Sequence, residues 1–289
     1  HGMGEALHEV VRKREGTRCR IYAPVGAHQD LLAYLVRRLL ENGANSSFVH
    51  QIVDTDVSAE TIAADPFAAA EAERSAFNTA IQRPSEIFGE GRVNSKGWDI
   101  TDPITFAELE KARTPFAAPH KWTAGPATRA KGKGESHDVF NPADLSEVVG
   151  TVTDATAKQV DEAVGLALKA QPAWAATPAA ERGAILRRIA DLYEAHAAEF
   201  FALATRETGK TLLDGIAEVR EAVDFLRYYA KEAPQAEKGT DARGVIVCIS
   251  PWNFPLAIFT GQIAAGLATG NAVVAKPAEN TSLIAARAV

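Results

Sequence analysis

The chain of 289 residues contains only two cysteines and one methionine. Cys19 and Cys248 lie far apart and lack the spacing of metal ligands, so neither a disulfide scaffold nor a metal site is predicted. No stretch approaches the roughly 18–20 apolar residues of a membrane span, and the polar N-terminus does not resemble a signal peptide. The net charge of −6 disfavours a general nucleic-acid surface. We therefore expect a protein of a reducing cytoplasm.

Both ends of the sequence look cut. It starts at His1 without an initiator methionine, and it ends at Val289 inside a predicted helix. A length of 289 residues suits two domains, or one domain with appendages. We expect the chain to be a piece of a longer protein.

A strand–helix–strand unit is predicted near the C-terminus. The apolar run at 245–249 is typical of a buried parallel strand, in which Cys248 would be an inert thiol. Pro251 and Pro255 end that strand, because proline fixes its own φ and restricts the preceding residue. A helix at 256–268 and a strand at 273–275 follow. Such a unit is half of a nucleotide-binding α/β fold.

Polar residues follow both of these strands. Asn253 stands in a Pro-Trp-Asn-Phe-Pro segment at 251–255, where its amide could stabilise an oxyanion. Lys276 and Glu279 stand in a Lys-Pro-Ala-Glu segment at 276–279 and could hold a ribose diol. For either segment alone, a turn asparagine and a solvated Lys/Glu pair are equally good interpretations.

Together the two segments resemble the signatures of the NAD(P)-dependent aldehyde dehydrogenase superfamily. The resemblance implies that Asn253 is the oxyanion-hole amide and that Lys276 and Glu279 hold the adenosine ribose. It also implies that the cofactor lies along Ile249, Ser250, Pro251 and Trp252.

Other parts of the superfamily's active site are missing from this sequence. The nucleophilic cysteine, the general-base glutamate and the glycine-rich turn are not found, and Ile263 follows the Gly-Gln pair where a nucleophile would stand. Glu221 resembles a glutamate that semialdehyde dehydrogenases place near the amino end of the substrate. A solvated helix carboxylate is the alternative for Glu221.

A helix predicted at 29–42 carries a polar stripe opposite an apolar one. The polar residues fall at i, i+3, i+4 and i+7, and they are Tyr34, Arg37, Arg38 and Glu41. The apolar residues are Leu32, Leu35, Val36 and Leu39. Two guanidinium groups on one stripe suit the bidentate capture of a carboxylate. A solvated face with an Arg37–Glu41 ion pair is the alternative.

The segments 20–26 and 34–44 resemble the last strand and last helix of the proline dehydrogenase barrel. They are most similar to the proline utilization A (PutA) family, which fuses that barrel to an aldehyde dehydrogenase. The resemblance implies that Arg37 and Arg38 bind the carboxylate of proline. It also implies that Tyr22 and Tyr34 hold the substrate against the flavin and that Glu41 contacts FAD.

The predicted fold class is α/β, in three parts. Residues 1–52 form the last strand and helix of a (β/α)8 proline dehydrogenase barrel, with the strand at 18–22. Residues 53–135 form a connector, whose proline-rich stretch at 81–127 is expected to lie over a surface. Residues 136–289 form the first part of a Rossmann-type, NAD-binding aldehyde dehydrogenase domain. Its first elements are strands at 137–141 and 148–152 and helices at 157–170, 179–208 and 212–233.

The resemblance implies a parent enzyme that oxidises L-proline to L-glutamate through pyrroline-5-carboxylate, with FAD and then NAD. It further implies a homo-oligomer and a quinone acceptor reached by peripheral membrane association. The fragment itself is expected to be inactive, and any DNA-binding module would lie upstream of His1. Two alternatives are a monofunctional aldehyde dehydrogenase of another specificity and a non-catalytic interaction or oligomerisation fragment.

Overall fold

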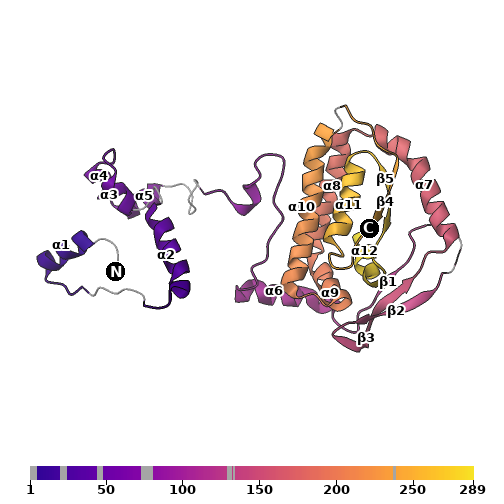
Figure 1. Cartoon of the computed structure of the whole chain (residues 1–289), viewed down its shortest axis with the longest axis horizontal. Helices are drawn as coiled ribbons and strands as arrows, with labels where there is room; N and C mark the ends of the chain where they lie inside the picture. Colours follow the sequence, from indigo (N-terminus) through magenta and orange to yellow (C-terminus); the bar gives the residue numbers. More distant parts are fainter. Residues whose placement is uncertain are drawn as a thin grey trace. The chain divides into compact units, whose positions relative to one another are not determined.

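The computed structural model describes residues 5–19, 25–43, 48–72, 81–128, 132, 134–236 and 239–289. Two compact units make up the chain, His1–Ile81 and Gln82–Val289. Figure 1 labels their helices and strands. In the described ranges, no helix combines the length and the apolar character that crossing a membrane requires.

The first unit contains five helices in its described residues: α1 (Glu5–Glu15), α2 (His28–Gly43), α3 (Phe48–Val53), α4 (Ala59–Ile62) and α5 (Pro66–Ala72). The helix predicted at 29–42 is therefore confirmed as α2. Its apolar stripe is exposed, from 44% at Val36 to 72% at Leu39. Of the strand predicted at 18–22, Arg18 and Cys19 are not in a strand, and residues 20–22 lie outside the described part.

The prediction that residues 81–127 lie over a surface is wrong at a few positions, although most of the stretch is exposed. It contains η1 (Pro84–Glu86), α6 (Pro103–Arg113), η2 (Thr114–Phe116) and β1 (Trp122–Ala124). Leu109 and Trp122 belong to the core of the second unit. The prolines were interpreted as loop signals, but Pro103 starts a helix, a position where its missing N–H costs nothing.

A three-stranded sheet follows, with the order β1-β3-β2. The strands β2 (Ser136–Asn141) and β3 (Asp144–Thr153) form the predicted hairpin, and β1 pairs with β3 in parallel. Arg206 attaches this sheet to the helices. Its guanidinium donates to Glu147 Oε1 on β3 at 2.7 Å and to the carbonyls of Phe116 and His120.

Four helices come next: α7 (Ala157–Ala176), α8 (Ala179–Ala195), α9 (Ala197–Thr208) and α10 (Leu212–Ala236). The prediction of one helix over 179–208 is wrong, because the chain leaves helical geometry at His196. After this break Phe200 and Phe201 are both 1% exposed. The local sequence does not signal this break, because no glycine or proline lies at His196. The break is instead accompanied by the packing of both phenylalanines in the core.

The predicted strand–helix–strand unit is confirmed. The strand β4 (Val245–Ile249) leads into α11 (Ala257–Ala268) and then into β5 (Ala272–Lys276), which is parallel to β4. The 3-10 turn η3 (Glu279–Thr281) and α12 (Ser282–Ala288) end the chain. Figure 1 shows the two strands between α7 on one side and α11 on the other. Cys248 is buried in β4, as expected.

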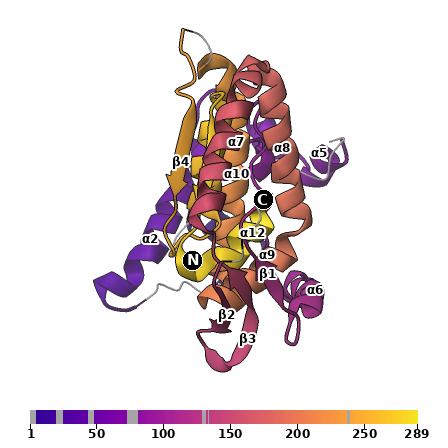
Figure 2. The same cartoon turned by 90° about the vertical axis from the view of Figure 1, so that its right-hand side faces the viewer.

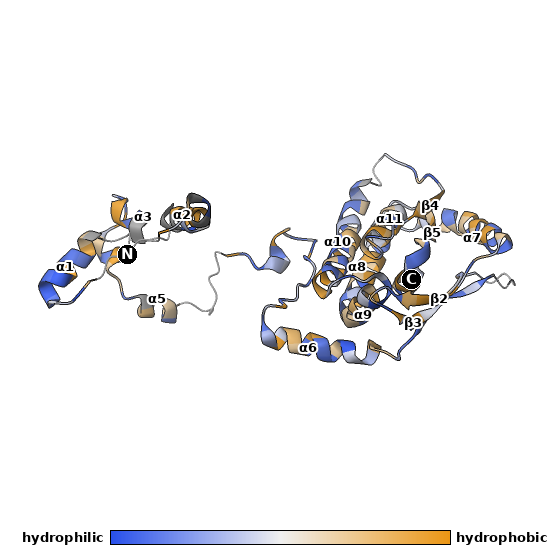
Figure 3. Cartoon of the chain, turned by 60° about the horizontal axis from the view of Figure 1, so that its bottom comes forward, coloured by the Kyte–Doolittle hydropathy of each residue, from blue (hydrophilic) through white to orange (hydrophobic). Residues whose placement is uncertain are grey.

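The core of the second unit lies between α8, α9, α10 and α11. Apolar residues gather there in Figure 3, and Figure 2 shows α8 and α10 running alongside one another. Gly183 on α8 permits this close packing, since a Cβ atom at that position would lie 2.7 Å from the carbonyl oxygen of Ala230 on α10. The long helix α10 therefore packs against α8, α9 and α11 and is the central helix of this core.

Candidate active site

The structure brings the two signature segments to one edge of the β4–β5 sheet. Ile249, the last residue of β4, pairs with Lys276, the last residue of β5. The N–H of Ser250 donates to the carbonyl of Lys276 at 3.1 Å. The segment 251–255 and the segment 276–279 therefore start side by side at the carboxyl ends of parallel strands, where ligands of open α/β sheets bind.

The loop that carries Asn253 is fixed at both ends. At its start Ser250 is 6% exposed, and its hydroxyl donates to Gln262 Oε1 on α11 at 3.0 Å. At its end Pro255 and Leu256 are buried. Asn253 is exposed between them, which leaves its amide accessible to a substrate. Trp252 and Ile249 are also exposed, by 61% and 67%, so an apolar surface borders the amide.

A charged cluster lies next to this loop. Lys210 follows the end of α9, and its Nζ is 3.2 Å from Glu218 Oε1 on α10 and 5.2 Å from the centre of the Phe254 ring. The Glu218 contact is an ion pair without hydrogen-bond geometry at Oε1. The other oxygen, Oε2, accepts from the N–H groups of Leu256 and Ala257 at 3.1 and 2.8 Å.

Glu221 belongs to the same cluster. It lies one helical turn beyond Glu218 on α10 and is exposed at its surface. Burial raises the pKa of Glu221, the carboxylate of Glu218 raises it further, and Lys210 lowers it. Its role near a substrate's amino group stays a prediction. Its charged neighbours are Glu218 and Lys210.

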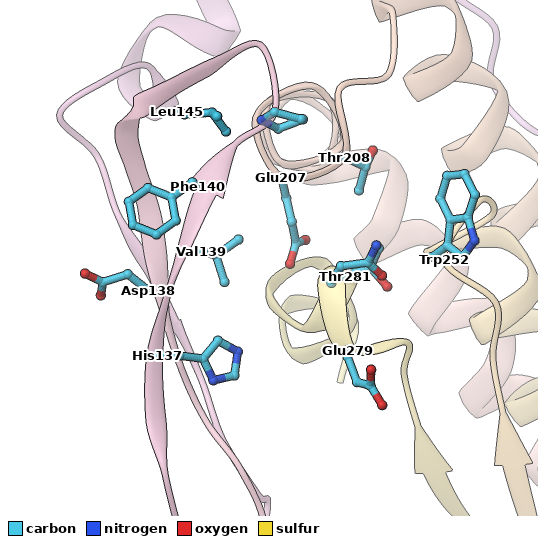
Figure 4. Close-up of a pocket in the computed structure, with 12 residues that line it drawn as sticks. His137, Asp138, Val139, Phe140, Leu145, Glu207, Thr208, Trp252, Glu279 and Thr281 are labelled. Atoms are coloured by element: carbon cyan, nitrogen blue, oxygen red, sulfur yellow. The ribbon is translucent and has the colours of Figure 1, made fainter.

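The second signature borders a cleft of about 560 Å3. Trp252 and Glu279 line it, together with His137 on β2 and Glu207 at the end of α9 (Figure 4). Lys276 is exposed at the same edge of the sheet, where its Nζ donates to the carbonyl of Pro277 at 3.0 Å. A cation and a carboxylate are thus accessible beside a cleft that Phe140 and Trp252 line with aromatic rings, which suits a ribose and its attached groups.

Glu207 is 4% exposed, and each of its oxygens accepts one backbone N–H from α12. The distances are 2.7 Å from Leu283 and 2.8 Å from Ile284. Burial raises the pKa of Glu207 to about 7, although both hydrogen bonds lower it. Glu207, Glu218 and Lys210 were not predicted from the sequence. A carboxylate on an apolar helix face, such as Glu218 beside Val219 and Ala222, is a signal that could have identified one of them.

The proposed proline site is described only in part. In α2, Tyr34 is half-buried and Arg37 is exposed, one turn apart. Arg38 and Glu41 lie in the same helix, but their side chains are outside the described part of the structure, as is the whole of Tyr22. The roles assigned to these five residues stay predictions. Among the described residues, no group of three His, Cys, Asp or Glu side chains is arranged to hold a metal ion.

Comparison with known proteins gives the family. The profile of the aldehyde dehydrogenase family matches residues 129–289, which contain both signature segments. The chain belongs to the aldehyde dehydrogenase family. The proline dehydrogenase profile matches residues 1–51, which contain the polar stripe of α2. Two oxidoreductase families therefore follow one another in a single chain, as the sequence predicted.

Individual relatives show the same arrangement. The chain is 48% identical to the bifunctional protein PutA of Escherichia coli, an alignment that covers 100% of this chain and 23% of that protein. It superimposes on a mutant of Bradyrhizobium japonicum PutA with a TM-score of 0.78 at 40% identity, over 100% of this chain and 28% of that one. The resemblance to PutA enzymes and the α/β fold class are confirmed, for a chain that spans about a quarter of its relatives.

The aldehyde dehydrogenase part also has separate structural relatives. A 1-pyrroline-5-carboxylate dehydrogenase from Thermus, crystallised with NAD, matches with a TM-score of 0.63 at 28% identity. That match covers 68% of this chain and 41% of the Thermus chain. About two thirds of the chain thus shares its fold with that Thermus enzyme.

Proposed function

We propose that this chain is part of a bifunctional enzyme that oxidises L-proline to L-glutamate. The single observation that carries the proposal is the order of the two family matches along one chain, proline dehydrogenase at 1–51 and aldehyde dehydrogenase at 129–289. A monofunctional aldehyde dehydrogenase would leave the first match without a function. The two reactions are connected by a small molecule, pyrroline-5-carboxylate, which is the product of the first site and the precursor of the substrate of the second.

In the first reaction proline loses two hydrogens to become pyrroline-5-carboxylate. FAD supplies the oxidising power, and a quinone at a membrane surface receives the electrons. Within this chain Arg37 and Arg38 would hold the carboxylate of proline in a charge-assisted, bidentate pair. Tyr22 and Tyr34 would orient the ring, and Glu41 would contact FAD. We assign no further step to these residues.

In the second reaction the hydrolysed product, glutamate semialdehyde, is oxidised to glutamate. NAD would supply the hydride acceptor. The residues present fit this cofactor, because Lys276 and Glu279 are exposed beside the cleft and Trp252 forms part of its wall. Ile249, Ser250 and Pro251 would line the cofactor further along the edge. Asn253 would donate its amide N–H to the oxygen that becomes negative as the aldehyde is attacked.

The test uses the complete enzyme that contains this chain. We expect proline-dependent reduction of a quinone analogue and formation of NADH from pyrroline-5-carboxylate. Turnover of simple aliphatic aldehydes without either of these activities would contradict the proposal and favour a monofunctional enzyme. We further propose a homo-oligomer in the cytoplasm that contacts the membrane peripherally; gel filtration and flotation with vesicles test both points.

A further inference from the structure

Two buried glutamates have the same relationship to the two signature segments. Glu218 accepts from the N–H groups of Leu256 and Ala257, at the start of α11. Glu207 accepts from the N–H groups of Leu283 and Ile284, at the start of α12. Each carboxylate therefore holds the helix that follows one signature segment, and it occupies N–H groups that have no partner inside the helix.

Both glutamates lie in the buried part of the unit. Glu218 is 2% exposed and Glu207 is 4% exposed. Their helices, α10 and α9, form the core with α8. A buried carboxylate without partners would be costly, so these contacts are expected to be kept in the folded protein. They connect the core directly to the first residues after each site segment.

Each of these helix starts lies only a few residues after a functional side chain. Asn253 is three residues before Leu256, and Pro255 is buried between them. Glu279 is the first residue of the 3-10 turn η3 and lies four residues before Leu283. A displacement of either helix start would therefore move the functional side chain that precedes it. A shift of about 1 Å is enough to cost on the order of a hundredfold in rate when it affects a reacting group.

We propose that Glu218 and Glu207 are positioning residues of the aldehyde dehydrogenase site. Glu218 fixes the loop that presents Asn253 to the substrate, and Glu207 fixes the turn that presents Glu279 to the ribose. The inference rests on the proposed function for the roles of Asn253 and Glu279. The anchoring itself rests only on the contacts.

The two carboxylates differ in a way that a substitution can detect. Glu218 uses one oxygen, Oε2, for both N–H groups, so the carbonyl oxygen of a glutamine could accept both, while its NH2 group would replace the oxygen that lies 3.2 Å from Lys210 Nζ. Glu207 uses one oxygen for each N–H group, so a glutamine there would turn its NH2 towards one donor. Glu218→Gln should keep both backbone hydrogen bonds, while Glu207→Gln should lose one of its two.

The first test is steady-state kinetics of the complete enzyme with pyrroline-5-carboxylate and NAD. We expect Glu218→Ala to lower kcat by about 10- to 100-fold with the KM for NAD changed less than about threefold. Glu218→Gln, which keeps both hydrogen bonds but loses the ion pair with Lys210, should have a kcat between those of Glu218→Ala and the parent enzyme. Glu207→Gln should raise the KM for NAD about 3- to 10-fold and leave kcat within about twofold.

Controls separate anchoring from general damage. Glu181, an exposed glutamate in the first turn of α8, serves as the matched site, and Glu181→Gln should change neither constant. Proline-dependent dye reduction by the same preparations reports the other active site and should be unchanged. An equal effect of both glutamine variants on kcat and KM would overturn the proposal.

The second test is hydrogen exchange of the complete enzyme, which does not depend on turnover. Glu207→Gln should accelerate exchange in peptides over 280–286 by at least about threefold and leave those over 253–259 unchanged. Glu218→Ala should do the opposite. Exchange that is unaltered in both regions would overturn the anchoring. An inactive parent enzyme with these same local changes would contradict the proposed function alone.

Discussion

Ile249 and Lys276 are paired in parallel register across β4 and β5. The two signature segments, separated by the helix α11, consequently begin at the same sheet edge. The amide of Asn253 and the side chains of Lys276 and Glu279 can then serve one ligand complex, because parallel strands place their carboxyl ends together. This pairing is the geometric basis of the proposed aldehyde oxidation, and the following predictions test its consequences.

Arg37→Met or Arg38→Met in the complete enzyme should raise the KM for proline sharply and leave aldehyde oxidation intact. The loss of one charge-assisted contact to the carboxylate should cost about 2–4 kcal/mol, or roughly 30- to 1,000-fold. Proline titration in a dye-reduction assay measures it. Arg14→Met, at an exposed position on α1, is the matched control. Unchanged proline kinetics in both variants would exclude the carboxylate-binding role.

Asn253→Ala should lower kcat for aldehyde oxidation by about 10²–10³, because the developing oxyanion loses a donor. NAD binding, measured by calorimetry, should be retained. A variant that loses NAD affinity but keeps its chemical rate would show that the amide serves the cofactor instead.

Lys276→Ala should raise the KM for NAD by about tenfold, with little change in kcat, because a charge-assisted hydrogen bond to the ribose is lost in both the ground state and the transition state. Kinetics with varied NAD at saturating pyrroline-5-carboxylate checks the prediction. Lys158→Ala, at an exposed position on α7, is the control. A fall in kcat at constant KM would argue against cofactor binding by Lys276.

Arg206→Met should destabilise the chain by about 3–5 kcal/mol, since removal of one partner leaves the other charge of a buried pair uncompensated. The guanidinium is 9% exposed and its partner Glu147 is 20% exposed. Urea unfolding followed by tryptophan fluorescence measures the loss, again with Lys158→Ala as control. A difference below about 1 kcal/mol would mean that the carbonyls of Phe116 and His120 are satisfied without Arg206.

Glu207 should make stability fall as the pH rises from about 4.5 to about 7, because burial raises its pKa from 4.5 to about 7. In that window the folded chain retains a proton that the unfolded chain has lost. The effect amounts to roughly 3 kcal/mol and is complete above neutral pH. Urea unfolding at about pH 5 and about pH 8 should show this loss in the parent chain and not in Glu207→Gln. Parallel pH dependences in the two proteins would contradict the raised pKa.

Local sequence determined the elements that carry the chemistry. The apolar run ending at Ile249 and the prolines at 251 and 255 placed the strand–helix–strand unit correctly. The amphipathic period of α2 likewise predicted its bounds to within a residue. These signals succeed because proline and side-chain periodicity restrict the backbone within a few residues. The family resemblance was equally local, since it depended on short contiguous segments.

Tertiary structure alone decided how those elements are held. Glu218 and Ala257 are 39 residues apart, and Glu207 and Ile284 are 77 apart. The pairing of β1 with β3 and the helix break at His196 also depend on which surfaces meet in the core. A buried carboxylate is stable only where distant N–H groups reach it, so no window of the sequence contains both partners. The sequence thus specified the site residues, and the packing of α9 and α10 specified their anchors.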